Sequence, residues 1–385
     1  MPPKKKDEAP PKKALLGRPG NTLKMGLVGM PSVGKSATFN LLTNLNVATG
    51  TFGSSADPNI AQVSVPDPRY EKLCAMYTPK KKTAATLLIT DIAGLVPGAS
   101  EGKGLGNAFL SHIQGVDGIY NVVRLFDDVA GEPINPVVDM QTVHDELIAK
   151  DLQGILAKME DLERMVKKVA DKSKQEELAV LTKVRDVLKT NLSVKDADWK
   201  ADEIDVLNRY QFLSAKPVVY LLNMSPEDYK KKTNKHLAKI VDWAKKHGEA
   251  PLVPYSAIYE AEVQKAENKD EFCKKEGAPS AVNKMIRIGY KELRLIYFFT
   301  VGPDEVKCWT IREGTTAKKA VAVIHTDMEK GFVCADVIKY QDLVDCGTEQ
   351  EAKSQGKEKQ MGKDYIVEDG DIIEFKVNVA KKKKK

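Results

Sequence analysis

The chain has 385 residues, of which 42% are hydrophobic, so it is long enough for two or three domains with sizeable cores. No apolar run approaches the ~20 residues of a membrane span, and the Pro- and Lys-rich start lacks the apolar region of a secretory signal. The five cysteines are scattered without a CxxC pair, which favours a reducing compartment and argues against a structural zinc site. We therefore expect a cytoplasmic protein that does not contact membranes.

The net charge of +6 is concentrated at the two ends of the chain. Residues 1–20 hold six basic and two acidic residues, and residues 379–385 add five lysines, so the rest of the chain is near −3. These ends could contact RNA, a ribosome surface or an acidic partner. The alternative is that they are disordered tails that keep the protein soluble.

The segment Gly29–Ser36 reads GMPSVGKS and matches the phosphate-binding loop G-x-x-x-x-G-K-S. Its glycines let several backbone N–H groups point at one anion, Lys35 adds a positive charge for the β- and γ-phosphates, and the Ser36 hydroxyl can bind Mg²⁺. Residues 23–28 suit a buried strand and residues 37–42 a helix, whose positive end would face the phosphates. The sequence therefore predicts phosphate binding.

A turn-rich segment, residues 49–59, follows the predicted helix. We expect it to form a mobile loop beside the triphosphate. Ser55 is the hydroxyl in it that we expect to reach the metal, because it lies between the phosphate loop and the next metal-binding motif.

That next motif is Asp91–Gly94, a D-x-x-G at the end of the β-rich run 85–90. In phosphate-loop GTPases such an Asp holds a water of Mg²⁺ and the Gly N–H senses the γ-phosphate. The glycine-rich residues 97–106 are typical of a switch that moves when this phosphate leaves. Leu95 stands where Ras-type enzymes have the Gln that orients water, so either another group positions water or hydrolysis is slow.

Between residues 140 and 192 apolar residues recur at alternating steps of four and three. The interruption at residues 171–175 predicts two helices that form an antiparallel hairpin inserted into the nucleotide domain. Ordinary core helices and a dimerising coiled coil are the alternatives.

The nucleotide domain resumes with two predicted strands, residues 217–222 and 251–255. They end at Asn223 and Ser256, where GTPases carry the base-reading N-K-x-D motif and an S-A loop. Here the first motif reads Asn223-Met224-Ser225-Pro226, without the Lys or the Asp.

The missing Asp favours adenine over guanine. Guanine offers N1–H and an exocyclic amine, which would both lose their partner at roughly 1–3 kcal/mol each. The Asn223 carbonyl suits the adenine amine, and the Met224 backbone could bind the ring edge. Asp228 could replace the missing Asp only if the backbone looped out.

The pattern of strands and a helix after residue 293 predicts a small β-grasp domain. Its expected elements are two paired strands, a helix and a second strand pair, at residues 293–300, 306–311, 316–330, 365–367 and 372–377. Trp309 and Tyr365 alternate with other apolar residues, which favours core packing over base stacking.

Eight stretches in order along the chain resemble the Obg-like ATPases, the YchF subfamily of P-loop NTPases. They are GMPSVGKS at 29–36, DPN at 57–59, DIAGLV at 91–96, GLGNAFLSHI at 104–113, LLNMS at 221–225, YFFTVGPDEVKCWTIREGT at 297–315, HTDMEKGF at 325–332 and YIVEDGDIIEFK at 365–376. The resemblance implies an α/β fold, with a P-loop G-type nucleotide domain, an inserted helical hairpin and a C-terminal TGS domain of β-grasp type. It also implies ATP hydrolysis, ribosome association and a role in translation or stress responses.

This resemblance sets the expected domain boundaries. They are a basic tail at 1–20, the G domain at 21–130 and 213–280, the helical insertion at 131–212, the TGS domain at 293–378 and a Lys-rich tail at 379–385.

The resemblance also implies the site residues. Contacts to the nucleotide fall on Gly29, Ser32, Val33, Gly34, Lys35, Ser36, Ala37, Asn223, Met224 and Ser256, and the metal ligands are Ser36, Ser55 and Asp91.

Three positions depart from the family pattern. Ser32 replaces an Asn that can hold a monovalent cation in related proteins, which leaves K⁺ dependence open. Asn121 stands where many relatives have a His proposed to assist hydrolysis, and Pro226 replaces the usual Glu.

We therefore predict a mostly monomeric, Mg²⁺-dependent ATPase that acts as a slow switch on a ribosomal surface. Lys35, Asp91 and Gly94 would be its catalytic residues. One alternative is a ribosome-associated GTPase, and another is a scaffold in which ATP binding gates partner docking without hydrolysis.

Overall fold

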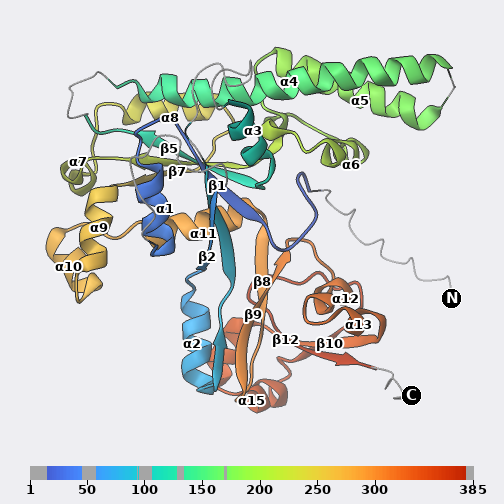
Figure 1. Ribbon diagram of the computed structural model, residues 1–385. Helices are drawn as coiled ribbons and strands as arrows, with labels where there is room; N and C mark the ends of the chain where they lie inside the picture. The colour runs from blue at the N-terminus through green and yellow to red at the C-terminus, as the bar shows by residue number, and fades with distance from the viewer. Residues whose placement is uncertain are drawn as a thin grey trace.

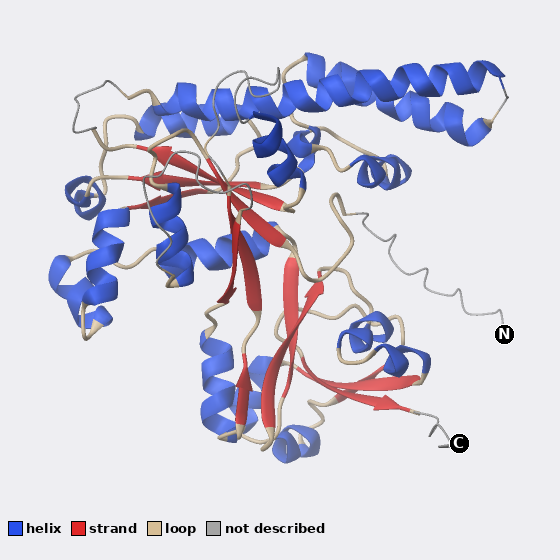
Figure 2. Cartoon of the chain, viewed as in Figure 1, coloured by secondary structure: helices blue, strands red, loops and turns tan. Residues whose placement is uncertain are grey.

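The computed structural model describes residues 15–45, 58–92, 94, 106–127, 134–168 and 171–378, and the side chains of 106–108 lie outside the description. Two predicted positions, Ser55 and Leu95, lie outside the described residues. The described chain forms two six-stranded sheets and a long helical hairpin (Figures 1 and 2). The α/β fold with a helical hairpin inserted into the nucleotide domain is thereby confirmed.

The first sheet has the strand order β2-β4-β1-β5-β6-β7, and all its pairs are parallel except β2 with β4. Its strands are β1 (Lys24–Val28), β2 (Asn59–Ser64), β4 (Thr86–Asp91), β5 (Gly118–Arg124), β6 (Val218–Asn223) and β7 (Leu252–Tyr255). The carboxyl ends of the parallel strands meet at one edge, which is where such sheets bind ligands.

Helices cover both faces of this sheet, which explains why its parallel strands are almost continuously apolar. One face packs against α1, α9 and α11, and the other against α3, α4 and α8. These helices are α1 (Lys35–Thr43), α3 (Gly106–Gln114), α4 (Pro136–Lys168), α8 (Leu237–Lys246), α9 (Ala257–Lys265) and α11 (Val282–Glu292).

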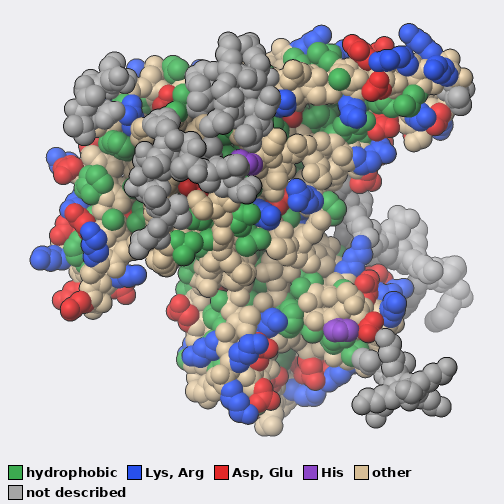
Figure 3. Space-filling model, in the orientation of Figure 1, with side chains coloured by type: hydrophobic (Ala, Val, Ile, Leu, Met, Phe, Trp, Pro, Cys, Tyr) green, Lys and Arg blue, Asp and Glu red, His purple; other side chains and the backbone are tan. Residues whose placement is uncertain are grey.

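The helical hairpin consists of α4 (Pro136–Lys168) and α5 (Lys172–Lys189), which extend away from the sheet (Figure 1). Asp171 caps α5 by accepting hydrogen bonds from the N–H groups of Ser173 and Lys174. The buried stripe contains Ile148, Ile155, Met159, Leu181, Val184 and Leu188. Basic and acidic side chains intersperse over the outer end of the hairpin (Figure 3). The heptad-like spacing therefore correctly predicted two arms that cover each other. The short helix α6 (Ala201–Tyr210) follows them.

The second sheet has the strand order β11-β10-β12-β8-β9-β3. Strands β8 and β9 are antiparallel, and β12 lies parallel to β8 and antiparallel to β10, which is a β-grasp arrangement. The strands are β3 (Lys81–Thr83), β8 (Leu295–Thr300), β9 (Glu305–Arg312), β10 (Phe332–Ile338), β11 (Lys359–Met361) and β12 (Ile372–Val377).

Two expectations about this part were wrong. The helix expected over 316–330 is broken into α12 (Ala317–Ala320), a 3₁₀ turn and α13 (Thr326–Lys330), because His325 interrupts it and caps α13. Residues 365–367 form no strand; Ile366 makes only an isolated bridge to Thr316, and β12 pairs with β10 instead. Trp309 and Tyr365 pack against the core, as expected.

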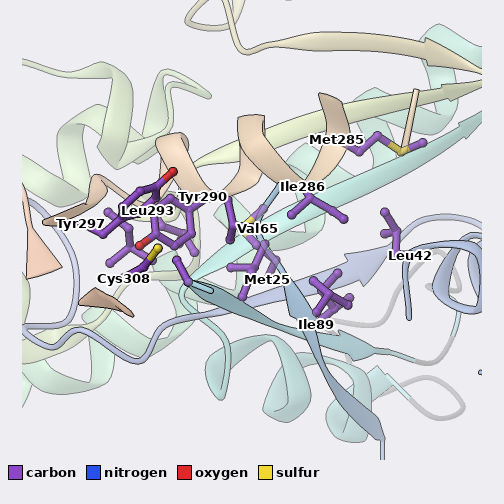
Figure 4. Close-up of a cluster of buried hydrophobic side chains, with 14 of the residues drawn as sticks. Met25, Leu42, Val65, Ile89, Met285, Ile286, Tyr290, Leu293, Tyr297 and Cys308 are labelled. Carbon is purple, nitrogen blue, oxygen red and sulfur yellow. The ribbon is translucent and has the colours of Figure 1, made fainter. Parts of the chain in front are cut away.

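The two sheets share one stretch of chain, residues 59–91, which the sequence did not indicate. This stretch runs through β2, helix α2 (Pro68–Tyr77), β3 and β4, and β3 pairs in parallel with β9 of the second sheet. One hydrophobic cluster continues from Met25 and Ile89 in the first sheet to Tyr297 and Cys308 in the second (Figure 4). The nucleotide domain and the β-grasp domain are therefore joined through a common core.

No helix among the described residues is long and apolar enough to cross a membrane.

Candidate nucleotide-binding site

The phosphate loop follows β1 at the carboxyl edge of the first sheet, and both of its glycines are required by its shape. Gly29 has φ 148°, and a Cβ there would lie 2.5 Å from the Val122 carbonyl oxygen. Gly34 has φ 97°, and a Cβ there would lie 2.6 Å from Asn223 Nδ2. Ser32 also has a positive φ of 59°, so the loop turns sharply at three positions.

Lys35 begins α1 and folds back over the loop. Its Nζ donates hydrogen bonds to the carbonyl oxygens of Gly29 at 3.2 Å and Met30 at 2.8 Å. Burial lowers the pKa of Lys35 to about 8, against the opposing effect of Asp91. A Cβ on Gly94 would lie 3.2 Å from this Nζ, so the structure brings the D-x-x-G motif onto the phosphate loop.

Ser36 and Asp91 hydrogen-bond to each other at the same edge. Burial raises the pKa of the Asp91 carboxyl, and the bond from Ser36 and the charge of Lys35 only partly offset that effect. A buried carboxylate beside a hydroxyl provides the hard oxygen ligands that Mg²⁺ prefers. These two residues therefore fit a magnesium site.

Asn223 of β6 and Tyr255 of the neighbouring strand β7 hold the phosphate loop, and Tyr255 acts through Thr38 of α1. Asn223 at the end of β6 is buried; its Nδ2 donates to the Val33 carbonyl oxygen at 3.0 Å and its Oδ1 accepts from Ala257 N at 3.0 Å. Thr38 Oγ1 donates to the Gly34 carbonyl oxygen at 2.8 Å and shares a 2.5 Å hydrogen bond with the Tyr255 hydroxyl.

Sequence reasoning missed the bond between Thr38 and Tyr255. The available signal was the polar residue Thr38, which lies one turn into the helix that follows the phosphate loop.

Comparisons with known proteins agree with this geometry. Residues 24–183 match a family model described as 50S ribosome-binding GTPase, and residues 295–378 match YchF-GTPase_C, described as a protein of unknown function. The chain is 46% identical to Obg-like ATPase 1 of Oryza sativa subsp. japonica and 44% identical to that of Homo sapiens, covering 99% and 100% of each chain.

Among solved structures, that of the Schizosaccharomyces pombe YchF GTPase matches with a TM-score of 0.85 and 42% identity, over 94% of this chain and 100% of that one. The chain belongs to the Obg-like ATPase (YchF) family. It is thereby a P-loop NTPase family member.

The residues expected to bind the base in this Obg-like chain already make hydrogen bonds within the protein. The Asn223 carbonyl already accepts a hydrogen bond from Ala257, so an adenine amine would have to share it. The Met224 side chain packs into the core beneath α8, and its N–H donates to the Tyr255 carbonyl oxygen, which leaves only its own carbonyl for a base. Ser256 is buried and caps α9 by accepting from Tyr259 N.

The structure also decides the role of Asp228. Ser225 caps the short helix α7 (Pro226–Lys231), with Pro226 as its first residue and Asp228 in its first turn. The Asp228 carboxylate accepts a 2.6 Å hydrogen bond from Asn234 Nδ2, and its N–H donates to Ser225 Oγ at 3.1 Å. Asp228 is therefore fixed within this helical turn.

Asn121 lies within β5, and its side chain lines a small internal cavity with Val143 and His144 of α4. It faces the sheet side opposite α1 and is only 2% exposed. Because β-strand side chains alternate, this side chain points toward α4 and not toward Lys35.

Proposed function

We propose that this Obg-like family member is a Mg²⁺-dependent ATPase that works as a slow nucleotide-controlled switch. The observation that carries the proposal is the meeting of two motifs at one sheet edge. Lys35 Nζ lies beside Gly94, and Ser36 bonds to Asp91, so groups for the phosphates and the metal lie together at this edge. The relatives named Obg-like ATPase 1 support ATP as the substrate.

Each group has a role in phosphoryl transfer. Mg²⁺, held by Ser36 and through Asp91, would neutralise charge that develops on the β- and γ-phosphates. Lys35 would exchange its two carbonyl partners for phosphate oxygens, which are stronger acceptors because they are charged. The Gly94 N–H would report the presence of the γ-phosphate to the segment that follows it.

Slow turnover is proposed from residue type. Leu95 can neither hydrogen-bond to water nor accept a proton, so basal kcat should lie well below the ~1–10³ s⁻¹ of ordinary enzymes. Single-turnover hydrolysis of Mg²⁺-ATP by the full chain tests this. A fast basal rate would contradict it, and a rate no higher than that of the Lys35→Ala variant would favour the non-hydrolysing scaffold.

We propose a preference for ATP over GTP from the residues that stand at the base-reading positions of GTPases. The position that carries the guanine-pairing Asp in GTPases is Pro226, and Asp228 is held by Asn234. We expect ATP to bind roughly tenfold more tightly, which is about 1.4 kcal/mol. Competition calorimetry with the two Mg²⁺-nucleotides decides between the alternatives, since equal or tighter GTP binding would make the chain a GTPase, as the fission-yeast relative is named.

Ribosome association is the second part of the proposal. It is supported by the family model described as ribosome-binding and by the Lys-rich ends of the chain. We also propose that the protein is cytoplasmic and mostly monomeric. Co-sedimentation with ribosomes should weaken as salt rises, because phosphate contacts release counterions. Deletion of residues 381–385 should lower affinity modestly, and unchanged binding at every salt concentration would contradict the electrostatic part.

A further inference from the structure

A cavity of about 590 Å³ lies at the amino-terminal edge of the first sheet, opposite the phosphate loop. Leu23, Asp117, Pro217 and Pro251, which precede four of its strands, line one side. The N-terminal segment at residues 15–18, the helical insertion, residues 248–250 and 292–294, and Arg312 of β9 line the rest. Its volume is typical of a small-molecule site.

Three cationic side chains and the carboxylate of Asp117 lie at one corner of this cavity, and the buried Asp151 carboxylate also acts on the charge of Lys216. Arg18 Nε lies 3.3 Å from Asp117 Oδ1, and an Arg312 guanidinium nitrogen donates to the Arg18 carbonyl oxygen at 2.7 Å. Lys216 Nζ donates to a backbone carbonyl at 2.5 Å. Within the part of the chain that the structure describes, neither Lys216 nor Arg312 has a carboxylate within ion-pair distance. This corner of the cavity therefore has an excess of positive charge.

The excess charge is poorly solvated. Lys216 is 8% exposed, and burial lowers its pKa to about 8 and lowers that of Arg312. The Arg18 side chain is 39% exposed, and its buried Nε faces Asp117 as an ion pair without a hydrogen bond among the described residues. A buried cation without full hydrogen bonding is costly, so an anion placed here would be stabilised by charge-assisted bonds.

The other acidic residues of the lining do not cancel this charge. Asp196 is paired with Lys195 at 2.6 Å, and Asp198 and Glu249 are exposed. The negative charge of Asp117 raises the pKa of Arg312 and the positive charge of Arg294 lowers it, so Asp117 is the carboxylate that acts on this guanidinium.

The insertion supplies an apolar wall. Leu207 and Phe212 are buried, and Trp199 is held by a 2.7 Å hydrogen bond from its Nε1 to the Val194 carbonyl oxygen. A fixed aromatic ring costs little entropy when it packs against a ligand.

We propose that this cavity binds a small organic anion. Its carboxylate, phosphate or sulfonate would lie among Arg18, Lys216 and Arg312, and its apolar body would pack against Trp199 and Phe212. The ligand would contact the N-terminal segment, the helical insertion and the β-grasp domain at once. The site is separate from the phosphate loop and does not depend on which nucleotide is hydrolysed.

The test uses 8-anilinonaphthalene-1-sulfonate as the probe, because it joins a sulfonate to an aromatic body. The full chain is first saturated with Mg²⁺-ADP, so that the phosphate loop is filled. We expect one saturable site with energy transfer from tryptophan to the probe. In Trp199→Phe this transfer should fall, because one of the three tryptophans is removed, while the probe still binds.

Charge variants then locate the sulfonate. Arg312→Gln and Arg18→Gln should each weaken binding at least tenfold. The matched control is Arg294→Gln, which also lines the cavity but is exposed and paired with Glu313 at 3.2 Å; binding should stay within twofold.

Three results would overturn the proposal. They are unchanged affinity in both Arg312→Gln and Arg18→Gln, an equal loss in Arg294→Gln, and energy transfer that is unchanged in Trp199→Phe. If Arg312→Gln does not fold, Arg18→Gln gives the same information, because it removes a cation nearer the surface.

Discussion

The phosphate-binding edge and the junction between the two sheets both contain buried charges, but they neutralise them differently. At the binding edge Lys35 bonds only to carbonyl oxygens and Asp91 to a hydroxyl. At the junction Asp67 pairs with Arg69 at 2.8 Å and also accepts from the Tyr297 hydroxyl. Charges satisfied by neutral groups remain ready for a ligand, whereas charges that neutralise each other act as structure.

The Asp67–Arg69 pair bonds to residues of the second sheet domain. Asp67 and Arg69 begin α2, and Arg69 also pairs with Asp369 at 2.8 Å beside β12 and lies over the Tyr297 ring. Burial alone would raise the pKa of Asp67, but the hydrogen bonds from Arg69 and Tyr297 lower it overall. This network links the start of α2 to β8 and to the turn before β12.

The largest predicted effect is that of Lys35→Ala on catalysis. Removing the cation that faces the phosphates should slow single-turnover ATP hydrolysis by at least ~100-fold, as loss of a preorganised electrostatic group does. The same change should alter the free energy of unfolding little, because it removes the cost of burying the cation and this offsets the lost attraction to Asp91. The control is Lys80→Ala, an exposed residue paired with exposed Asp304. A stable variant that retains a tenth of the activity would contradict this role.

The opposite pattern is expected for Arg69→Ala. Asp67 would be left buried without its cation, so the free energy of unfolding should fall by about 3 kcal/mol. Urea unfolding measures this, with Lys80→Ala again as the control at below about 0.5 kcal/mol. Nucleotide affinity of the folded variant should stay near that of the wild type. A loss below about 1 kcal/mol would remove the distinction between the two regions.

The two regions also differ in how far the sequence predicted them. The phosphate loop is a local motif, so Gly29, Lys35 and Ser36 could be placed by spacing alone. The pairing of Lys81–Thr83 with a strand more than 200 residues later could not, because a three-residue edge strand has no periodicity. The same limit applies to Asn223: its type was predicted to matter, but its bonds to Val33 and Ala257 depend on the tertiary fold.

Asn223→Ala should weaken nucleotide binding without changing selectivity. It removes two buried hydrogen bonds that shape the phosphate loop, at roughly 1–3 kcal/mol for each group left unpaired. Affinities for ATP and GTP should therefore fall together by roughly tenfold or more. Calorimetry on both nucleotides checks this, and a loss confined to ATP would instead show that Asn223 reads the base.

Pro226→Asp provides the matched change in selectivity. It restores a carboxylate where GTPases pair guanine, at the first position of α7, where an acidic residue suits the helix dipole. GTP affinity relative to ATP should rise by roughly tenfold. An unchanged ratio would place base recognition elsewhere.

The last prediction concerns Asp151 of α4, a buried carboxylate with neutral hydrogen-bond partners outside the phosphate-binding edge. Its buried carboxylate accepts from Leu213 N, Ser214 N and Ser214 Oγ at 2.7–2.9 Å, all neutral groups, yet it lies away from the phosphate loop and anchors the helical hairpin. Burial raises the pKa of Asp151 from 3.8 to about 6, against these hydrogen bonds. Here the hydrogen-bond donors are neutral although the carboxylate is structural. Its titration should reveal the free-energy cost of burying it.

The folded chain keeps the Asp151 proton between about pH 4 and 6, whereas the unfolded chain loses it. The free energy of unfolding should therefore fall as pH rises through that window and level off above it. Asp151→Asn does not titrate, and its loss of hydrogen bonding is the same at every pH. The pH dependence of the difference in the free energy of unfolding between wild type and variant therefore isolates the titration of Asp151. Carboxyl ¹³C NMR should give a midpoint near 6. A midpoint at or below 4 would show that the three donors fully compensate burial, and Asp151 would then resemble the paired charges of the junction.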